Sequence, residues 1–195
     1  MPKKISVKTA ATRFTDASNS ILTFFKETAG LKETHQHWCA DYAAIRLYRE
    51  FETLMLESLS GSINNDSRTI SSTVGCSFPK HMSRAVCQYL IVGTGYFDFH
   101  GRDGLIQTVK GFIPDDHYLT KILKKPEYKD SLERLSAIRN FAAHDSDRAK
   151  EAARRAIGGE KMGSAGYWLR KADHFEKLVT ELKALARDIE RDAPY

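Results

Sequence analysis

The sequence lacks the features of secreted and membrane-spanning proteins. It has three cysteines in 195 residues, an odd number with no CxxC pair, which argues against a disulfide framework and favours a reducing compartment. No stretch approaches the roughly 18 to 20 uninterrupted apolar residues that span a membrane. The basic N-terminus is not followed by the apolar segment of a secretory signal. We therefore expect a cytoplasmic protein with no membrane partner.

The sequence also lacks internal repeats, dense blocks of like charge and the alternating pattern of β-strands. Its formal net charge of +5 and pI of about 9.0 permit a polyanionic partner but do not require one. Apolar residues instead recur three and four positions apart along most of the chain, which is the spacing of amphipathic helices. The sequence thus predicts an all-α protein folded as one domain over residues 1–195.

This spacing also predicts where the helices of the first half lie. A first helix covers about residues 5–28 and ends before Gly30. A second helix of about 25 residues ends at Gly61 and buries one stripe. We expect that stripe to contain Trp38, Tyr42, Ile45, Tyr48, Phe51, Met55 and Leu59. Residues 61–78 are polar and rich in glycine and serine, and predict a long loop. Pro79 then suits the first turn of a central helix that runs to about Val92.

In the second half, residues 96–99 remain ambiguous between a helix end and a short extended piece. Short helices are expected near residues 103–111 and 115–124, followed by a helix over 127–144. Residues 145–147 are good helix-capping residues for the alanine- and arginine-rich helix that follows. The last helix is predicted to run unbroken from about 165 to 191, with an apolar seam that packs along a helix of this chain or of a second copy.

The helix over 127–144 ends in Arg139-Asn140-Phe141-Ala142-Ala143-His144, a set of residues suited to phosphate chemistry. Arginine binds phosphate through a bidentate fork, and histidine can give or take a proton near neutral pH. On an ideal helix Arg139 and His144 lie about 140° apart, so they converge only if the helix loosens at its end, if Arg139 reaches around, or if a second chain completes the site. With RNA, the 2′-hydroxyl is an internal nucleophile, so cleavage needs no metal.

This run, preceded by LERLSAI and followed by DSDRAKEAARRAI, resembles the R-x4-6-H signature of the HEPN superfamily. The early helix with LYREFETLMLESL and the closing helix with WLRKxxxFE are similar to the RiboL-PSP-HEPN branch or its neighbours. The resemblance covers about residues 35–190. It implies a HEPN-like bundle of about five to seven helices and a metal-independent endoribonuclease without cofactors, with Arg139 and His144 catalytic and Asn140 supporting. It further implies an RNA substrate, a homodimer with a composite site, a role as a toxin or phage-defence effector, and a possible antitoxin or other neutralising protein. Some HEPN domains are instead inactive modules that bind nucleotides or proteins.

Other polar residues are weaker candidates for the site. Arg154 and Arg155 either contact phosphates along a bound strand or form a solvated helix face. Glu50, Glu52 and Glu57 are interpreted as an exposed, ion-paired helix face, and Glu52, at the edge of the apolar stripe, is the one that reaches the site if any of them points inward. The cluster of His35, His37 and Cys39 could hold a metal in a hydrolase, but a polar helix start explains it better.

Overall fold

The computed structural model describes residues 6–194, which form ten α-helices and two short 3-10 turns, with no strand in that range. The all-α prediction is confirmed, although the helices outnumber the expected five to seven. The helices are α1 (Val7–Glu27), α2 (Glu33–Asn65), α3 (Arg68–Val74), α4 (Arg84–Val92), α5 (Gly101–Lys110), α6 (Tyr118–Lys124), α7 (Lys129–His144), α8 (Asp147–Ala156), α9 (Ala165–Arg170) and α10 (His174–Asp192). None of the helices in the described range combines the length and apolar character needed to cross a membrane.

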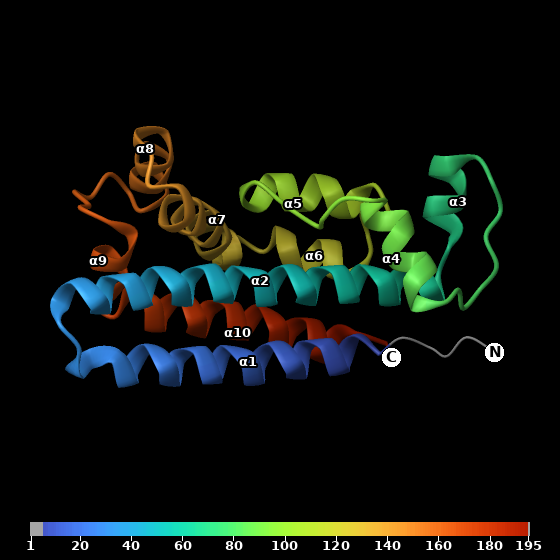
Figure 1. Cartoon of the computed structure of the whole chain (residues 1–195). Coiled ribbons are helices and arrows are strands. Elements are labelled where there is room, and N and C mark those ends of the chain that lie inside the picture. The colour runs from blue at the N-terminus through green and yellow to red at the C-terminus, as the bar shows by residue number, and fades with distance from the viewer. Residues whose placement is uncertain (1–5, 195) are drawn as a thin grey trace.

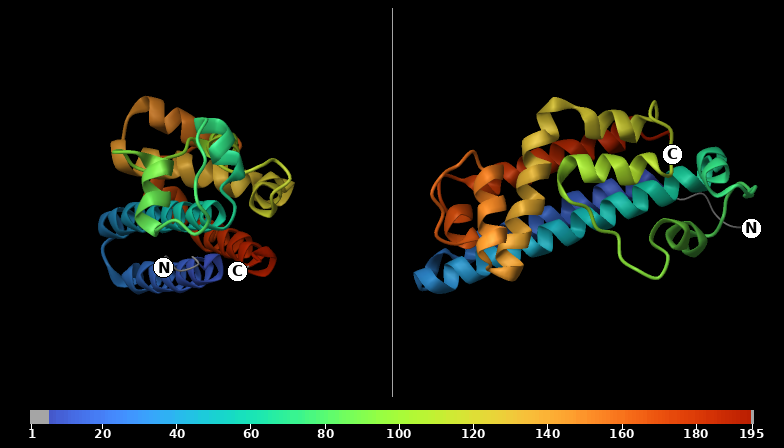
Figure 2. Two further views of the ribbon diagram at one scale, coloured as in Figure 1. Left: turned by 90° about the vertical axis from the view of Figure 1, so that its right-hand side faces the viewer. Right: turned by 90° about the horizontal axis from the view of Figure 1, so that it is seen from above.

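The fold has two layers that share α2. In Figure 1, α1, α10 and α2 lie side by side as the three longest rods, and α1 packs against both of the others. The shorter helices cover the opposite side of α2, where α7 and α9 pack directly against it. Seen from above, α7 crosses over α2 (Figure 2). Side chains near this crossing therefore come from segments almost a hundred residues apart in the chain.

The helix that carries the RNFAAH run forms as the sequence predicts. Its apolar stripe of Leu132, Leu135, Ile138 and Phe141 is buried in the main core. Burying four large apolar side chains on one face stabilises the helix by several kcal/mol, at about 1.5–3 kcal/mol for each. Ser131 and Ser136 are buried as well, whereas Ala143 and His144 at the end of the helix are exposed.

The predicted core stripe of α2 is wrong at its start and its predicted end is wrong as well. Trp38 and Tyr42 are 63% and 58% exposed. The buried residues here are instead Ala40, Ala43, Ala44 and Leu47. Small residues carry the core here because α9 approaches closely: a Cβ added at Gly166 would lie 2.1 Å from the backbone oxygen of His37. Gly61 does not end the helix but is buried inside it, since α2 continues to Asn65.

The expected long loop over residues 61–78 is largely helical. After α2 ends, α3 begins at Arg68 and packs Ile70 into a small second core with Ile63, Met82 and Cys87. α4 begins at Arg84 rather than at Pro79, and Ser83 caps it by accepting a hydrogen bond from the Val86 N–H. α4 is not central either, because Cys87 is its one buried side chain.

The predicted last helix is two helices. α9 ends at Arg170 and α10 begins at His174, and between them Ala172 and Asp173 adopt positive φ values of 51° and 57°. Positive φ is costly for residues with a Cβ and breaks the helix. The seam from Phe175 to Ile189 is buried as expected, and its partner in this chain is α1.

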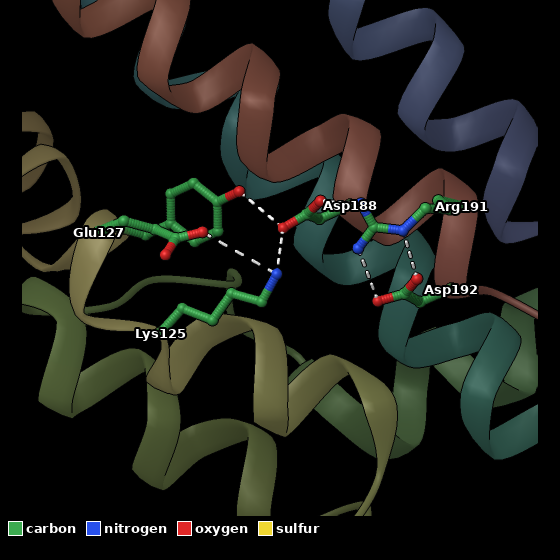
Figure 3. Close-up of polar contacts among 6 residues, drawn as sticks. Lys125, Glu127, Asp188, Arg191 and Asp192 are labelled. Carbon is green, nitrogen blue, oxygen red and sulfur yellow. Dashed lines mark hydrogen bonds and ion pairs between the residues drawn. The ribbon is translucent and has the colours of Figure 1, made fainter.

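The C-terminal half of α10 is fixed by a closed polar network (Figure 3). The buried Asp188 accepts hydrogen bonds from Lys125 Nζ (2.5 Å) and Tyr128 Oη (2.7 Å) at one oxygen, and pairs with Arg191 Nη1 (2.6 Å) at the other. Burial alone would raise the pKa of Asp188, but these bonds and charges hold it below its ordinary value. Both carboxylate oxygens are thus satisfied within the fold.

Candidate functional site

Arg139 is half-buried on α7 and is oriented by uncharged partners. Its Nη1 donates to Oδ1 of Asn140 at 2.7 Å, and its guanidinium carbon lies 4.6 Å from the centroid of the Tyr48 ring on α2. Among residues 6–194 no carboxylate forms an ion pair with it. The ring and the amide orient the guanidinium, and its charge acts on the Glu52 carboxyl without an ion pair between them, so the guanidinium can still bind an anion.

Arg139 lines an open groove of about 820 Å³ between α2, α7 and residues 96–98. This volume lies within the range of about 300–1,000 Å³ that is typical of small-molecule sites. The polar and aromatic side chains that line it are Tyr48, Arg49, Glu52 and Thr53 of α2, Tyr96, Phe97 and Asp98, and Arg139 itself. The groove therefore combines two guanidinium groups, two carboxyl groups and three aromatic rings.

The wall formed by residues 96–99 is not helical, which settles the ambiguity left by the sequence. Phe97 and Phe99 are buried, and the Tyr48 ring stacks on Phe99 with 4.9 Å between centroids. The Tyr48 hydroxyl donates to Oδ1 of Asp98 (2.7 Å) and to the Phe99 carbonyl (3.0 Å). These contacts anchor the segment and leave Tyr96 at the rim of the groove, 96% exposed.

Glu52 faces the groove, although the sequence favoured an exposed, ion-paired position for it. It is half-buried and forms no hydrogen bond with any side chain or backbone group between residues 6 and 194. Burial raises the pKa of its carboxyl to about 7, and Asp98 contributes to the rise, whereas the charges of Arg139 and Arg49 oppose it. A carboxyl that exchanges its proton near neutral pH therefore shares the groove with Arg139.

The two neighbouring glutamates are ion-paired as the sequence predicts, but they are half-buried rather than exposed. Glu50 pairs with Arg46 at 2.6 Å, one helical turn away on α2. Glu57 pairs with Arg84 of α4 instead of with a residue of its own helix. The ion-paired interpretation is therefore correct for these two and wrong for Glu52.

His144 is exposed at the last position of α7 and does not line the groove. The helix does not loosen before His144, because α7 continues to that residue. Asp145 then ends the helix in the left-handed conformation (φ 40°). On such a helix His144 lies about 7.5 Å beyond Arg139 along the axis and about 140° around it. Within one copy, the structure thus does not bring the imidazole and the guanidinium to one point.

The helix α8 begins as predicted and carries the two remaining arginines. Ser146 caps it by accepting a hydrogen bond from the Ala149 N–H at 3.3 Å. Arg154 pairs with Glu151 at 3.1 Å, while Arg155 is exposed. Neither lines the groove, so any contact they make with a bound strand lies outside it.

The residues that the sequence offers as metal ligands lie at the start of α2. The His35 ring faces Trp38, and the His37 ring meets Tyr167 edge-on, with 5.2 and 5.7 Å between ring centroids. Across residues 6–194 no three His, Cys, Asp or Glu side chains are grouped so that they could hold a metal ion. His35, His37 and Cys39 therefore do not form such a group.

The sequence pointed to Arg139 and Glu52, which line the groove, and to Asn140, which bonds to Arg139, but it gave no sign of Tyr48, Tyr96 and Asp98. Tyr48 looked like an ordinary core residue, and residues 96–98 carry no motif. Comparisons with protein-family models, with curated proteins and with solved structures find no match for this chain.

Proposed function

We propose that this protein is a metal-independent endoribonuclease of the HEPN type. The observation that carries the proposal is Arg139, a guanidinium fixed beside an open groove by an amide and an aromatic ring, with no carboxylate paired to it. Arg46 and Arg84 are paired with carboxylates, and Arg102 and Arg170 are held by backbone carbonyls of the fold, whereas Arg139 lines the open groove. An oriented but unpaired guanidinium is suited to a phosphodiester.

In the proposed reaction the 2′-hydroxyl of the RNA attacks the adjacent phosphorus. The hydroxyl loses its proton to a general base, the new O–P bond closes a 2′,3′-cyclic phosphate, and the bond to the 5′-oxygen breaks as that oxygen takes a proton. Arg139 stabilises the additional negative charge on the phosphorane, Asn140 holds the guanidinium in place, and the His144 imidazole transfers a proton. The step requires no metal and no cofactor.

The separation of Arg139 from His144 leads us to include a second copy in the proposal. His144 is exposed at the end of α7, so its imidazole can approach the groove of a second copy. A homodimer in which His144 of one copy serves Arg139 of the other would join both groups at one phosphate. Arg154 and Arg155, on the next helix, would then contact the strand beyond the cleavage point.

The test is cleavage of RNA by the purified protein in EDTA. We expect cleavage to persist in the chelator and to fall at least about 100-fold in Arg139→Ala and in His144→Ala, the size typical of losing a transition-state or proton-transfer group. Arg148→Ala and His35→Ala remove exposed side chains of the same types and serve as matched controls that stay active. A mixture of the two inactive variants should regain activity if the site is composite.

Two results would contradict this proposal. Activity that requires a divalent metal would exclude the mechanism. RNA binding without cleavage would favour the second candidate, an inactive HEPN-type module that binds nucleotides or proteins, for which the position of His144 outside the groove is the supporting observation. As a toxin or phage-defence effector, the active protein should inhibit growth when expressed, and a neutralising antitoxin should relieve the inhibition.

A further inference from the structure

The part of the groove beyond Arg139 has a composition that phosphate binding does not explain. Tyr96 stands at its rim with almost its whole ring in solvent, between a glycine-containing turn and the buried Phe97. An aromatic ring held by an anchored backbone and exposed beside a pocket is a stacking platform for a flat ligand. Arg49, across the groove on α2, adds a guanidinium plane of the kind that also stacks on bases.

Glu52 supplies the second observation. Among the described residues no group donates a hydrogen bond to Glu52, and its carboxyl oxygens are not among the buried unpartnered atoms, so they are open to a ligand in the groove. A ligand that offers N–H donors would satisfy it, whereas a phosphate would be repelled by it. The groove thus offers guanidinium groups for a phosphate and, at Glu52, a carboxyl that can accept hydrogen bonds from a ligand.

The chemistry of the four bases selects among possible ligands. A carboxylate accepts two parallel hydrogen bonds from two adjacent N–H groups. Guanine presents such a pair, N1–H and N2–H, on its Watson–Crick edge. Adenine and cytosine present one amino donor beside a ring acceptor, and uracil presents one N–H between two carbonyls, so each would place an acceptor against the carboxylate.

We propose that this groove binds a guanine base of RNA, with Glu52 accepting hydrogen bonds from N1–H and N2–H while the base stacks on Tyr96. This inference deepens the proposed ribonuclease function and rests on it for the identity of the polymer. Since Arg139 lines the same groove, a bound guanosine would place its own phosphate at the guanidinium. Cleavage would then occur next to guanosine.

The test is the binding of single nucleotides, which does not depend on cleavage. Guanosine, adenosine, cytidine and uridine 3′-monophosphates are titrated into the full-length protein at pH 8, where the Glu52 carboxyl is mostly ionised. We expect the guanosine nucleotide to bind at least tenfold more tightly than the others. Glu52→Gln should reduce this preference to less than about threefold, because an amide presents only one acceptor atom.

Matched variants separate recognition from general damage. Glu50→Gln, on the same helix but paired with Arg46, should keep the preference for guanosine. Tyr96→Ala should weaken all four nucleotides alike, and Tyr96→Phe should restore binding because it keeps the ring. Thermal unfolding of each variant verifies that it is folded.

The outcomes distinguish this inference from the proposed function. Equal affinity for the four nucleotides, no binding of any, or a preference that survives Glu52→Gln overturns guanine recognition even if the protein cleaves RNA. Conversely, guanosine-selective binding in a protein that cuts no RNA would retain the base site and remove the nuclease. A change in cleavage position upon Glu52→Gln would support both together.

Discussion

The protein contains two Tyr–Asp pairs with a cation beside each, and they differ in what the cation does. At the end of α10, Tyr128 and Lys125 share one oxygen of Asp188, while Arg191 takes the other. At the groove, Tyr48 donates to Asp98, but Arg139 stacks on the tyrosine and bonds to Asn140 instead of pairing with a carboxylate. In the first arrangement the cations are paired with the aspartate, whereas in the second the charge of Arg139 remains available to a ligand.

The pKa values of the nearby carboxyl groups express the same difference. Hydrogen bonds and cations hold the pKa of the buried Asp188 below its ordinary value, whereas burial raises the pKa of Glu52 to about 7. A carboxylate with a lowered pKa stabilises the folded state at neutral pH, and one with a raised pKa destabilises it. Similar residue types therefore serve stability in one region and leave the other open to a ligand.

The largest effect is expected from opening the closed network. Asp188→Ala leaves Tyr128 and Lys125 without their shared acceptor in a largely buried site and should cost about 3 kcal/mol in the free energy of unfolding. Urea unfolding at pH 7 measures it. Asp192→Ala is the control, because Asp192 is exposed and pairs only with Arg191, so the urea midpoint should not change. A loss below about 1 kcal/mol for Asp188→Ala would contradict the comparison.

A smaller change in the free energy of unfolding, of opposite sign, is expected when Glu52 in the groove is replaced. The folded-state pKa of Glu52 lies above the ordinary value of 4.5, so the native protein holds this proton more tightly than the unfolded chain does and loses stability as pH rises from 4.5 to about 7. Glu52→Gln removes that loss. The variant should match the wild type near pH 4.5 and exceed it at pH 8 by on the order of 1–2 kcal/mol.

Urea unfolding at several pH values provides this measurement. Asp41, whose pKa burial raises to about 6, titrates in the same range but is present in both proteins, so its contribution cancels in the difference. A variant that is less stable than the wild type at pH 8 would mean that Glu52 is already satisfied within the fold. The interpretation that the Glu52 carboxyl is free to bind a ligand would then be wrong.

The helix boundaries show what the sequence could predict. α7 was predictable because four large apolar residues recur on one face and a good cap follows it. The buried face of α2 was less predictable, because it begins with alanines while Trp38 and Tyr42 are exposed. A search for apolar periodicity follows the large apolar residues and therefore selects the wrong face there. The break at Ala172 has no local signal, since neither it nor Asp173 is a glycine or a proline.

The groove shows the same limit for function. Arg139 and Asn140 are adjacent in the chain, and their spacing from His144 on one helix forms a motif that can be recognised in the sequence. Asp98 and Tyr96 have no such pattern, and they reach the groove because Phe97 and Phe99 insert into the core beside Tyr48. A site that combines one helical motif with two segments remote in sequence is predictable only in its helical part.

The smallest effect compares the two tyrosines directly. Tyr128→Phe and Tyr48→Phe each remove one hydroxyl that bonds to an aspartate at 2.7 Å, and each should cost about 1 kcal/mol in unfolding free energy. Only Tyr48→Phe should alter ligand binding, because its hydroxyl also holds the Phe99 carbonyl and so positions Tyr96. We expect guanosine monophosphate affinity to fall about threefold in Tyr48→Phe, a change of roughly 0.7 kcal/mol, and to be unchanged in Tyr128→Phe. Equal affinity in the two variants would mean that the Tyr48–Asp98 pair, like its counterpart at α10, serves stability alone.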